Sequence, residues 1–289
     1  MMRARSWLPA VAFAVGLPLG TAAAPPPAPP PARVTDARLD YVAYTHGIPI
    51  LRFRVSLAVW PGGYRMRLGY GTIGLVGFFY RGHQVDVVAG GWRDGRPAPR
   101  TYRADGVWHG GVHHLRMTYR DGVPSLRAVM PPIRRERHRV PAADQVGTVD
   151  TLTAVVDLLR RLAISGSCMD SVRTFDGRRL GVIVARDAGD AALPRTARSI
   201  FAGPARRCDF TGRMLEGFLY GHRQRDSRPL HGAAWFAALE PGGAKLPVHL
   251  RFDTDWFGEV TMYLTHADLG ADALTATRST RHGKEAAPH

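Results

Sequence analysis

The chain has 289 residues, of which 45% are hydrophobic and 22% are charged. This length and composition suit one domain with a sizeable core, although a division into two lobes stays open. The formal net charge of +15 indicates either an anionic partner or a solvated basic surface, and no run of five basic residues occurs that would favour nucleic acid.

Residues 1–24 have the pattern of a secretory signal peptide. Arg3 and Arg5 precede an apolar stretch over 7–19, and small residues follow at 20–24. The apolar stretch is too short to span a bilayer. We therefore expect cleavage, a periplasmic location, no transmembrane segment after cleavage and no nucleic-acid partner.

The remaining chain divides by composition. Residues 25–33 are rich in proline and alanine and predict an extended spacer. Residues 34–270 predict a single β-rich domain. Residues 271–289 are rich in threonine, arginine, alanine and histidine and predict a disordered tail.

Apolar and polar residues alternate along much of the predicted domain. The clearest runs lie at 51–57, 64–70, 115–119, 248–252 and 260–264. Such alternation places one face of a sheet on a core and the other in water. Turn signals that contain glycine separate the runs at 61–63, 94–95, 105–106, 121–122, 176–177 and 241–243. The predicted fold is mainly β, a curved antiparallel sheet (half-barrel or open barrel) with one main amphipathic helix packed on it.

That helix is expected over residues 150–164. Leu152, Val156 and Leu159 recur at helical spacing, Asp150 suits the N-cap, and Gly166 can end the helix. A single amphipathic helix in a β protein most simply covers the open face or end of the sheet.

The chain has two cysteines, Cys168 and Cys208. In an oxidising compartment such a pair predicts one structural disulfide. In the chain-entropy model, closing this loop stabilises the fold by about 4 kcal/mol. The alternative is a nucleophilic cysteine with a histidine base, which would leave the second thiol idle.

Two further motifs suggest chemistry but fit structural roles better. The stretch GYGTIG at 69–74 matches a dinucleotide fingerprint, but hairpins surround it instead of a βαβ unit. His113 and His114 would point to opposite faces of a strand, and no zinc-protease or zinc-cysteine spacing occurs. There is no G-x-S-x-G elbow. We expect no catalytic residues, no metal and no cofactor.

The stretch VRTFDGRRLGVIVAR at 172–186 places a carboxylate and two arginines between apolar runs. It could be an active-site loop or a hairpin turn. Asp176-Gly177 is a favoured pair for a type I′ turn, and Arg178 or Arg179 at its exit can pair with Asp176. The pattern favours the turn.

Several stretches occur in a fixed order along residues 36–265: YRMRLGYGTIGLVGFFYRG, RDGRPAPRTYRADG, HHLRMTYRDGVPSLRAVMPP, and then GTVDTLTAV, a cysteine and VRTFDGRRL. This series resembles the uncharacterised bacterial family called domain of unknown function 3108. Thr151 and Thr153 stand where that family has proline and serine. The resemblance implies an exported, β-rich protein with a second cysteine at Cys208 and no catalytic residues to transfer. It also implies an architecture similar to the curved half-barrels that carry lipoproteins across the periplasm.

Two binding hypotheses and one enzymatic alternative follow. The leading hypothesis is a non-enzymatic envelope protein that holds an apolar or lipid-like ligand. Its candidate cavity residues are Phe53, Met66, Tyr70, Met117, Leu152, Val156 and Leu159, which could equally fill a closed core. The second hypothesis is an envelope interaction module that binds anionic lipid headgroups, polysaccharide or an envelope protein through an arginine-rich face. That face would comprise Arg52, Arg54, Arg65, Arg67 and Arg116. The third is a glycan hydrolase, which would need a buried carboxylate pair in a cleft.

Overall fold

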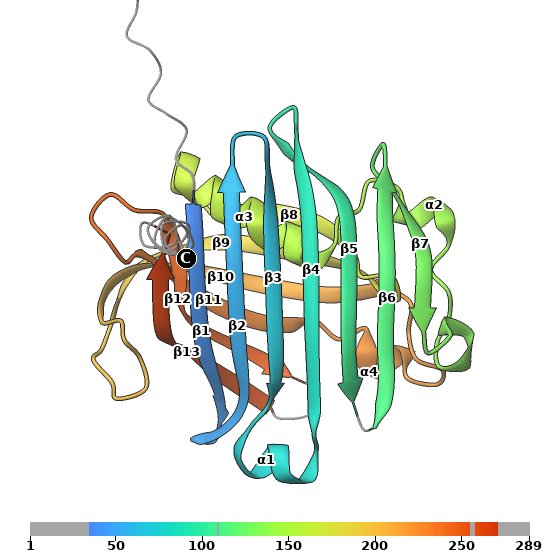
Figure 1. Ribbon diagram of the computed structural model, residues 1–289, viewed down its shortest axis with the longest axis horizontal. Helices are drawn as coiled ribbons and strands as arrows, with labels where there is room; N and C mark the ends of the chain where they lie inside the picture. The colour runs from blue at the N-terminus through green and yellow to red at the C-terminus, as the bar shows by residue number, and fades with distance from the viewer. Residues whose placement is uncertain (1–34, 109, 255–257, 271–289) are drawn as a thin grey trace, which may run out of the picture. The chain divides into compact units, whose positions relative to one another are not determined.

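The computed structural model describes residues 35–108, 110–254 and 258–270 (Figure 1). Contacts between Cα atoms divide the chain into residues 1–31 and 32–289, and all described residues belong to the second unit. The predicted signal peptide, the whole predicted spacer and the predicted tail lie outside the described residues.

The described part of the chain contains thirteen strands in one antiparallel sheet. Their order across the sheet is β7-β6-β5-β4-β3-β2-β1-β13-β12-β11-β10-β9-β8. The strands are β1 Thr35–Thr45, β2 Ile48–Trp60, β3 Gly63–Thr72, β4 Gly82–Arg93, β5 Arg96–Trp108, β6 Gly111–Arg120, β7 Val123–Met130, β8 Asp170–Phe175, β9 Leu180–Leu193, β10 Gly203–Glu216, β11 Leu230–Ala238, β12 Lys245–Thr254 and β13 Gly258–Leu269.

The sheet consists of two meanders that meet at β1 and β13. Strands β1–β7 form the first, strands β8–β13 form the second, and Ala43 pairs with Met262 where they join. The terminal strands β7 and β8 do not pair with each other, so the sheet is unclosed. The mainly β, antiparallel fold expected from the alternation is therefore present.

The fifteen-residue helix α3, Thr151–Ser165, lies between the two meanders. It contacts β3, β4 and β5 on one side and β8 and β12 on the other, so the sheet curls around it (Figure 1). We call the sheet face that packs against α3 the inner face. Residues just before α3 also pair with β8, where the Phe175 N–H donates to the Val149 carbonyl at 2.8 Å.

Local interactions fix where α3 begins and ends. Asp150 is the N-cap, and its carboxylate accepts hydrogen bonds from the Thr153 N–H (2.8 Å) and the Thr153 hydroxyl (2.7 Å). Gly166 ends the helix in the left-handed conformation at φ 70°, which glycine adopts without steric cost.

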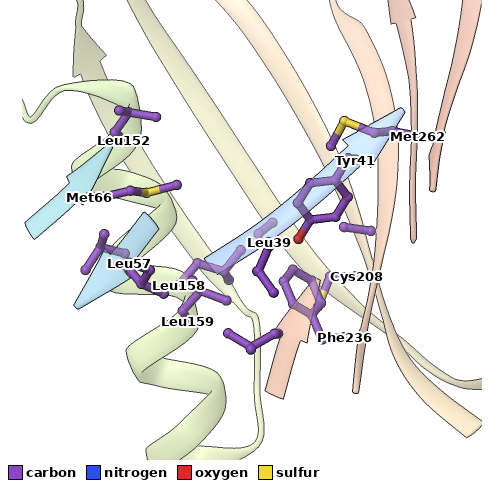
Figure 2. Packing of buried hydrophobic residues seen from close by; sticks show 14 of the residues in the cluster. Leu39, Tyr41, Leu57, Met66, Leu152, Leu158, Leu159, Cys208, Phe236 and Met262 are labelled. Carbon is purple, nitrogen blue, oxygen red and sulfur yellow. The ribbon is translucent and has the colours of Figure 1, made fainter. Parts of the chain in front are cut away.

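Apolar side chains of the inner face and of α3 form one continuous core. Figure 2 shows Leu57 and Met66 on the same side of the core as Leu152, with Phe236 and Met262 on strands of the other meander. On each strand, the side chains that alternate with the core residues point to the opposite, outer face. Arg52 and Arg54 are exposed there, between partly buried Leu51, Phe53 and Val55.

One predicted turn is wrong. Asp105-Gly106 lies inside β5 instead of ending a strand. Asp105 binds Arg103, His114 and Arg116 on the outer face. Gly106 is required because a Cβ there would meet the backbone oxygen of His83 at 2.6 Å. Glycine within a strand can thus mark a close backbone approach as well as a turn.

Shorter helical segments complete the fold. They are α1 Gly74–Phe79, the 3-10 helix Ile133–Arg135, α2 Ala142–Gln145 and α4 Arg223–Asp226. None of the helices in the described ranges combines the length and apolar character needed to cross a membrane.

Candidate functional site

An apolar cavity of about 570 Å³ lies between α3 and the inner face of the second meander. Its wall is almost wholly apolar. The helix contributes Ala154, Val155 and Leu158, and the strands contribute among others Ile183, Phe210, Phe236, Leu250 and Phe252. Cavities of a few hundred to about 1,000 Å³ with apolar walls are the usual form of small-molecule sites.

The predicted cavity residues do not line this space. Met66, Met117, Leu152, Val156 and Leu159 are buried in the core. Phe53 and Tyr70 are partly buried and stack on each other with ring centroids 5.5 Å apart. Phe53, Met66, Tyr70 and Met117 belong to the first meander. Leu152, Val156 and Leu159 are on α3, but the helix residues that line the cavity are Ala154, Val155 and Leu158 and their neighbour Thr151. The predicted cavity residues are therefore wrong, and the lining residues named above replace them.

The turn between β8 and β9 is built around the carboxylate of Asp176. Its Oδ1 accepts hydrogen bonds from the backbone N–H groups of Arg178 (2.9 Å) and Arg179 (2.7 Å), and its Oδ2 accepts one from Arg179 Nε (2.7 Å). The turn has four residues, 176–179, and only Gly177 has a positive φ, 88°. A type I′ turn needs positive φ at two successive residues, so the predicted turn type is wrong although the hairpin is present.

Arg179 decides the ionisation of Asp176. Burial alone would raise the pKa of this carboxyl, but the adjacent Arg179 guanidinium and the two backbone N–H groups hold the pKa below its ordinary value. Asp176 is therefore a structural anion. Its hydrogen-bonding capacity is spent on the turn, which leaves it poorly suited to act as a base.

The same turn contributes to a polar pocket of about 210 Å³ at the far edge of the first meander. Asp176, Arg178 and Arg179 come from the turn, and Glu136 and Arg137 come from the segment after β7. The opposite wall consists of inner-face and edge residues of β4 to β7, including Gln84, Tyr102, His113 and Met130. The turn thus joins the end of the second meander to the open edge of the first.

Hydrogen bonds hold this junction together. Arg178 Nη2 donates to the Pro131 carbonyl at 2.8 Å, and Arg178 Nη1 lies 3.8 Å from Glu136 Oε2. Arg137 Nη1 donates to the Gly217 carbonyl at 2.9 Å. Arg178 and Arg137 are therefore fixed by backbone carbonyls of separate segments, and Arg179 is fixed by the Asp176 carboxylate of its own turn. Such support is how a preorganised site is built.

A buried carboxyl, Asp86, lies on the inner face of β4 near this pocket. Its Oδ1 accepts a hydrogen bond from Gln84 Nε2 at 2.7 Å. Burial raises the pKa of Asp86 to about 6, against the effect of that hydrogen bond. Asp86 does not line the polar pocket and Asp176 is committed to the turn, so these two residues give the hydrolase alternative no support.

The five predicted face arginines lie on the outer face of the first meander. Arg65 and Arg67 are exposed, as are Arg52 and Arg54. Arg116 differs because it is half-buried and binds Asp105 at 3.1 Å. Four exposed arginines without an ion pair to any described residue therefore remain in this set, on β2 and β3.

Cys168 and Cys208 form a disulfide with their Cα atoms 6.2 Å apart. Cys168 follows α3, and Cys208 lies on the inner face of β10, so the bond attaches the end of the helix to the second meander. The predicted pairing is present, and both side chains are buried.

No model of a protein family matches the sequence, and no curated protein matches it. Among solved structures, the chain is similar to a β-barrel-like protein of domain of unknown function DUF1849 from Brucella abortus. The TM-score is 0.51 at 13% identity, and the match covers 83% of this chain and 99% of that one. At this identity the likeness shows the fold alone. The resemblance to domain of unknown function 3108 stays a prediction.

Sequence reasoning missed the two cavities for different reasons. The apolar cavity depends on which face of α3 each meander covers, and the alternation pattern does not contain this information. The polar pocket had a detectable signal, since Arg178 and Arg179 follow a glycine turn in an otherwise apolar hairpin. The basic stretch at 133–139 supplies the third arginine, but nothing in the sequence places it beside that turn.

Proposed function

We propose that this protein binds an apolar or lipid-like ligand in the cavity between α3 and the second meander, without catalysing a reaction. The observation that carries the proposal is a cavity of about 570 Å³ whose wall is almost entirely apolar. Contact with a ligand would remove that apolar surface from water, which is the main source of affinity for such sites.

The proposed setting is the cell envelope. The signal-peptide pattern of residues 1–24 supports export, and a buried disulfide suits an oxidising compartment. The β-barrel-like fold of the similar structure is compatible with a ligand-binding role.

Filling the cavity tests the proposal. Val155 lines the cavity, whereas Ile164 is on the same helix with 69% of its surface exposed. Val155→Trp should abolish binding of a fluorescent long-chain probe, and Ile164→Trp should leave it unchanged. Native mass spectrometry of the protein from its own envelope should show a bound apolar molecule that is lost in Val155→Trp. Equal probe binding by both variants would refute the cavity assignment.

A second candidate function is binding to an anionic membrane surface. On and just after α1, Leu75, Phe78, Phe79 and Tyr80 are 68%, 74%, 71% and 61% exposed. The sequence has no aspartate or glutamate between Asp40 and Asp86, while five arginines occur there. An exposed apolar tip beside uncompensated positive charge favours insertion into a bilayer with anionic headgroups.

Vesicle sedimentation separates this function from cavity binding. The wild type should sediment with vesicles that contain phosphatidylglycerol, and much less with phosphatidylcholine alone. Phe78→Ser with Phe79→Ser should remove the binding, and so should raising the salt from about 0.05 to about 0.5 M. Probe binding in the α3 cavity should be unaffected by that salt change. Sedimentation with neutral vesicles to the same extent would contradict the electrostatic part.

A further inference from the structure

We propose that the polar pocket binds the carboxylate or phosphate group of an anionic amphiphile, whose apolar part occupies the cavity beside α3. This inference rests on the proposed function and narrows its ligand to an acidic, chain-bearing molecule. Three observations carry it: the shared walls of the cavities, the accessibility of Arg179 and the excess of positive charge.

A third cavity of about 330 Å³ lies between the apolar cavity and the polar pocket. It shares Ile183 and Leu230 with the apolar cavity and shares Asp176 and Arg179 with the polar pocket. The third cavity therefore adjoins both of the others. The walls of the three cavities change from apolar at one end to charged at the other, which matches a molecule with a chain and a headgroup.

Arg179 lies at the point where the charged end begins. Its side chain is 54% accessible, and it lines both the polar pocket and the third cavity. Within the described residues its one side-chain hydrogen bond goes from Nε to Asp176. Both terminal NH₂ groups are left to donate, and this fork matches the two oxygens of a carboxylate or phosphate.

The pocket carries more positive than negative charge. Its lining contains three arginines and two carboxylates: Arg137, Arg178, Arg179, Asp176 and Glu136. Asp176 is hydrogen-bonded within the turn, and the side chain of Glu136 is 39% exposed. Arg137 Nε and Arg178 Nη1 are buried without a hydrogen bond to any described residue. Burial and the like charge of Arg179 lower the pKa values of both guanidinium groups. A bound anion would offset this repulsion, whereas a neutral headgroup would not.

A headgroup series on the wild-type protein provides the first test. Palmitate and hexadecanol have the same chain, and inorganic phosphate has no chain. We expect palmitate to bind at least about tenfold more tightly than hexadecanol, because charge-assisted hydrogen bonds to arginine contribute a few kcal/mol. Phosphate alone should compete only weakly, since most affinity comes from the chain.

Variants locate the effect. Arg179→Gln should weaken palmitate about tenfold or more and leave hexadecanol unchanged. Arg179→Lys keeps a positive partner for Asp176 and should give an intermediate loss of palmitate affinity. It serves as the control in case the glutamine variant disturbs the turn. Arg173→Gln is the matched control because Arg173 is an exposed arginine of the same hairpin that lines neither cavity.

The outcomes separate this inference from the proposed function. If palmitate and hexadecanol bind with equal affinity, and Arg179→Gln changes neither affinity, the headgroup site is overturned and apolar binding is left intact. Failure of both chains to bind would overturn both. Phosphate binding that depends on Arg179, without binding of either chain, would show a free-anion pocket and overturn the amphiphile assignment.

Discussion

At the scale of single residues, Asp86 is expected to reduce stability at neutral pH. Its folded pKa of about 6 is raised above the ordinary 3.8, so the folded state holds its proton more tightly than the unfolded chain. By linkage, ionisation of Asp86 lowers the free energy of unfolding. This loss is absent below about pH 4, grows as the pH rises toward 6, and is complete above it. Asp150, whose pKa burial also raises to about 6, adds to the same window.

Asp86→Asn should therefore stabilise the fold at pH 7. The amide oxygen can still accept the hydrogen bond from Gln84, and the ionisation cost of up to about 3 kcal/mol disappears. Urea unfolding at pH 7 and near pH 4 measures the effect, with the gain largest at pH 7 and close to zero at pH 4. A gain of the same size at both pH values would argue against ionisation as its cause.

Gly177 is required for two separable reasons. Its φ of 88° disfavours any residue with a Cβ, and a Cβ there would clash with the Leu115 side chain across the gap between the meanders. Gly95 has a similar φ of 72° with nothing within 4 Å of the added atom. Gly95→Ala should cost about 1–2 kcal/mol from the backbone alone.

Gly177→Ala should cost about 1–3 kcal/mol more than Gly95→Ala because of the added overpacking. Denaturant midpoints of the two variants give the difference directly. In a double-mutant cycle, Gly177→Ala should cost less in the Leu115→Ala background than in the wild type, because the clashing side chain is absent. Equal costs for the two alanine variants would mean that the turn does not press on the first meander.

At the scale of elements, the disulfide fastens the end of α3 to β10. Replacing both Cys168 and Cys208 by serine should lower the free energy of unfolding by about 2–4 kcal/mol. Urea unfolding with and without a reductant measures this loss. The reductant should destabilise the wild type by a similar amount and have no effect on the double variant. Insensitivity of the wild type to reduction under unfolding conditions would contradict a stabilising bond.

The elements also show how far the sequence determines the fold. Alternation in 51–57 and 115–119 assigns each side chain to the correct face, because a strand has only two faces. The capping signal at Asp150 and the glycine at 166 coincide with the ends of α3. The turn predicted at Asp105-Gly106 is wrong because Gly106 is needed for close approach to the backbone of His83 on a neighbouring strand. The local sequence does not contain this information.

At the scale of the whole molecule, function depends on how two meanders enclose one helix. Leu152 and Val155 are neighbours in the same helix, yet one packs in the core and the other lines a cavity. Which face of α3 is fully covered is decided by the pairing of β1 with β13 and by the turn at 176–179 that contacts the far edge. These contacts join residues far apart in the chain, so periodicity alone could not locate the site.

A ligand held between the meanders should stabilise the whole fold. Binding to the folded state alone adds RT ln(1 + [L]/Kd), about 2.7 kcal/mol at a ligand concentration of 100 Kd. Thermal unfolding of the wild type should therefore shift upward continuously with palmitate concentration. Val155→Trp should give a flat response because its cavity is filled, and Ile164→Trp should follow the wild type. A shift of equal size in all three proteins would instead place the ligand on the surface, because only a ligand between α3 and the second meander is displaced by the new indole.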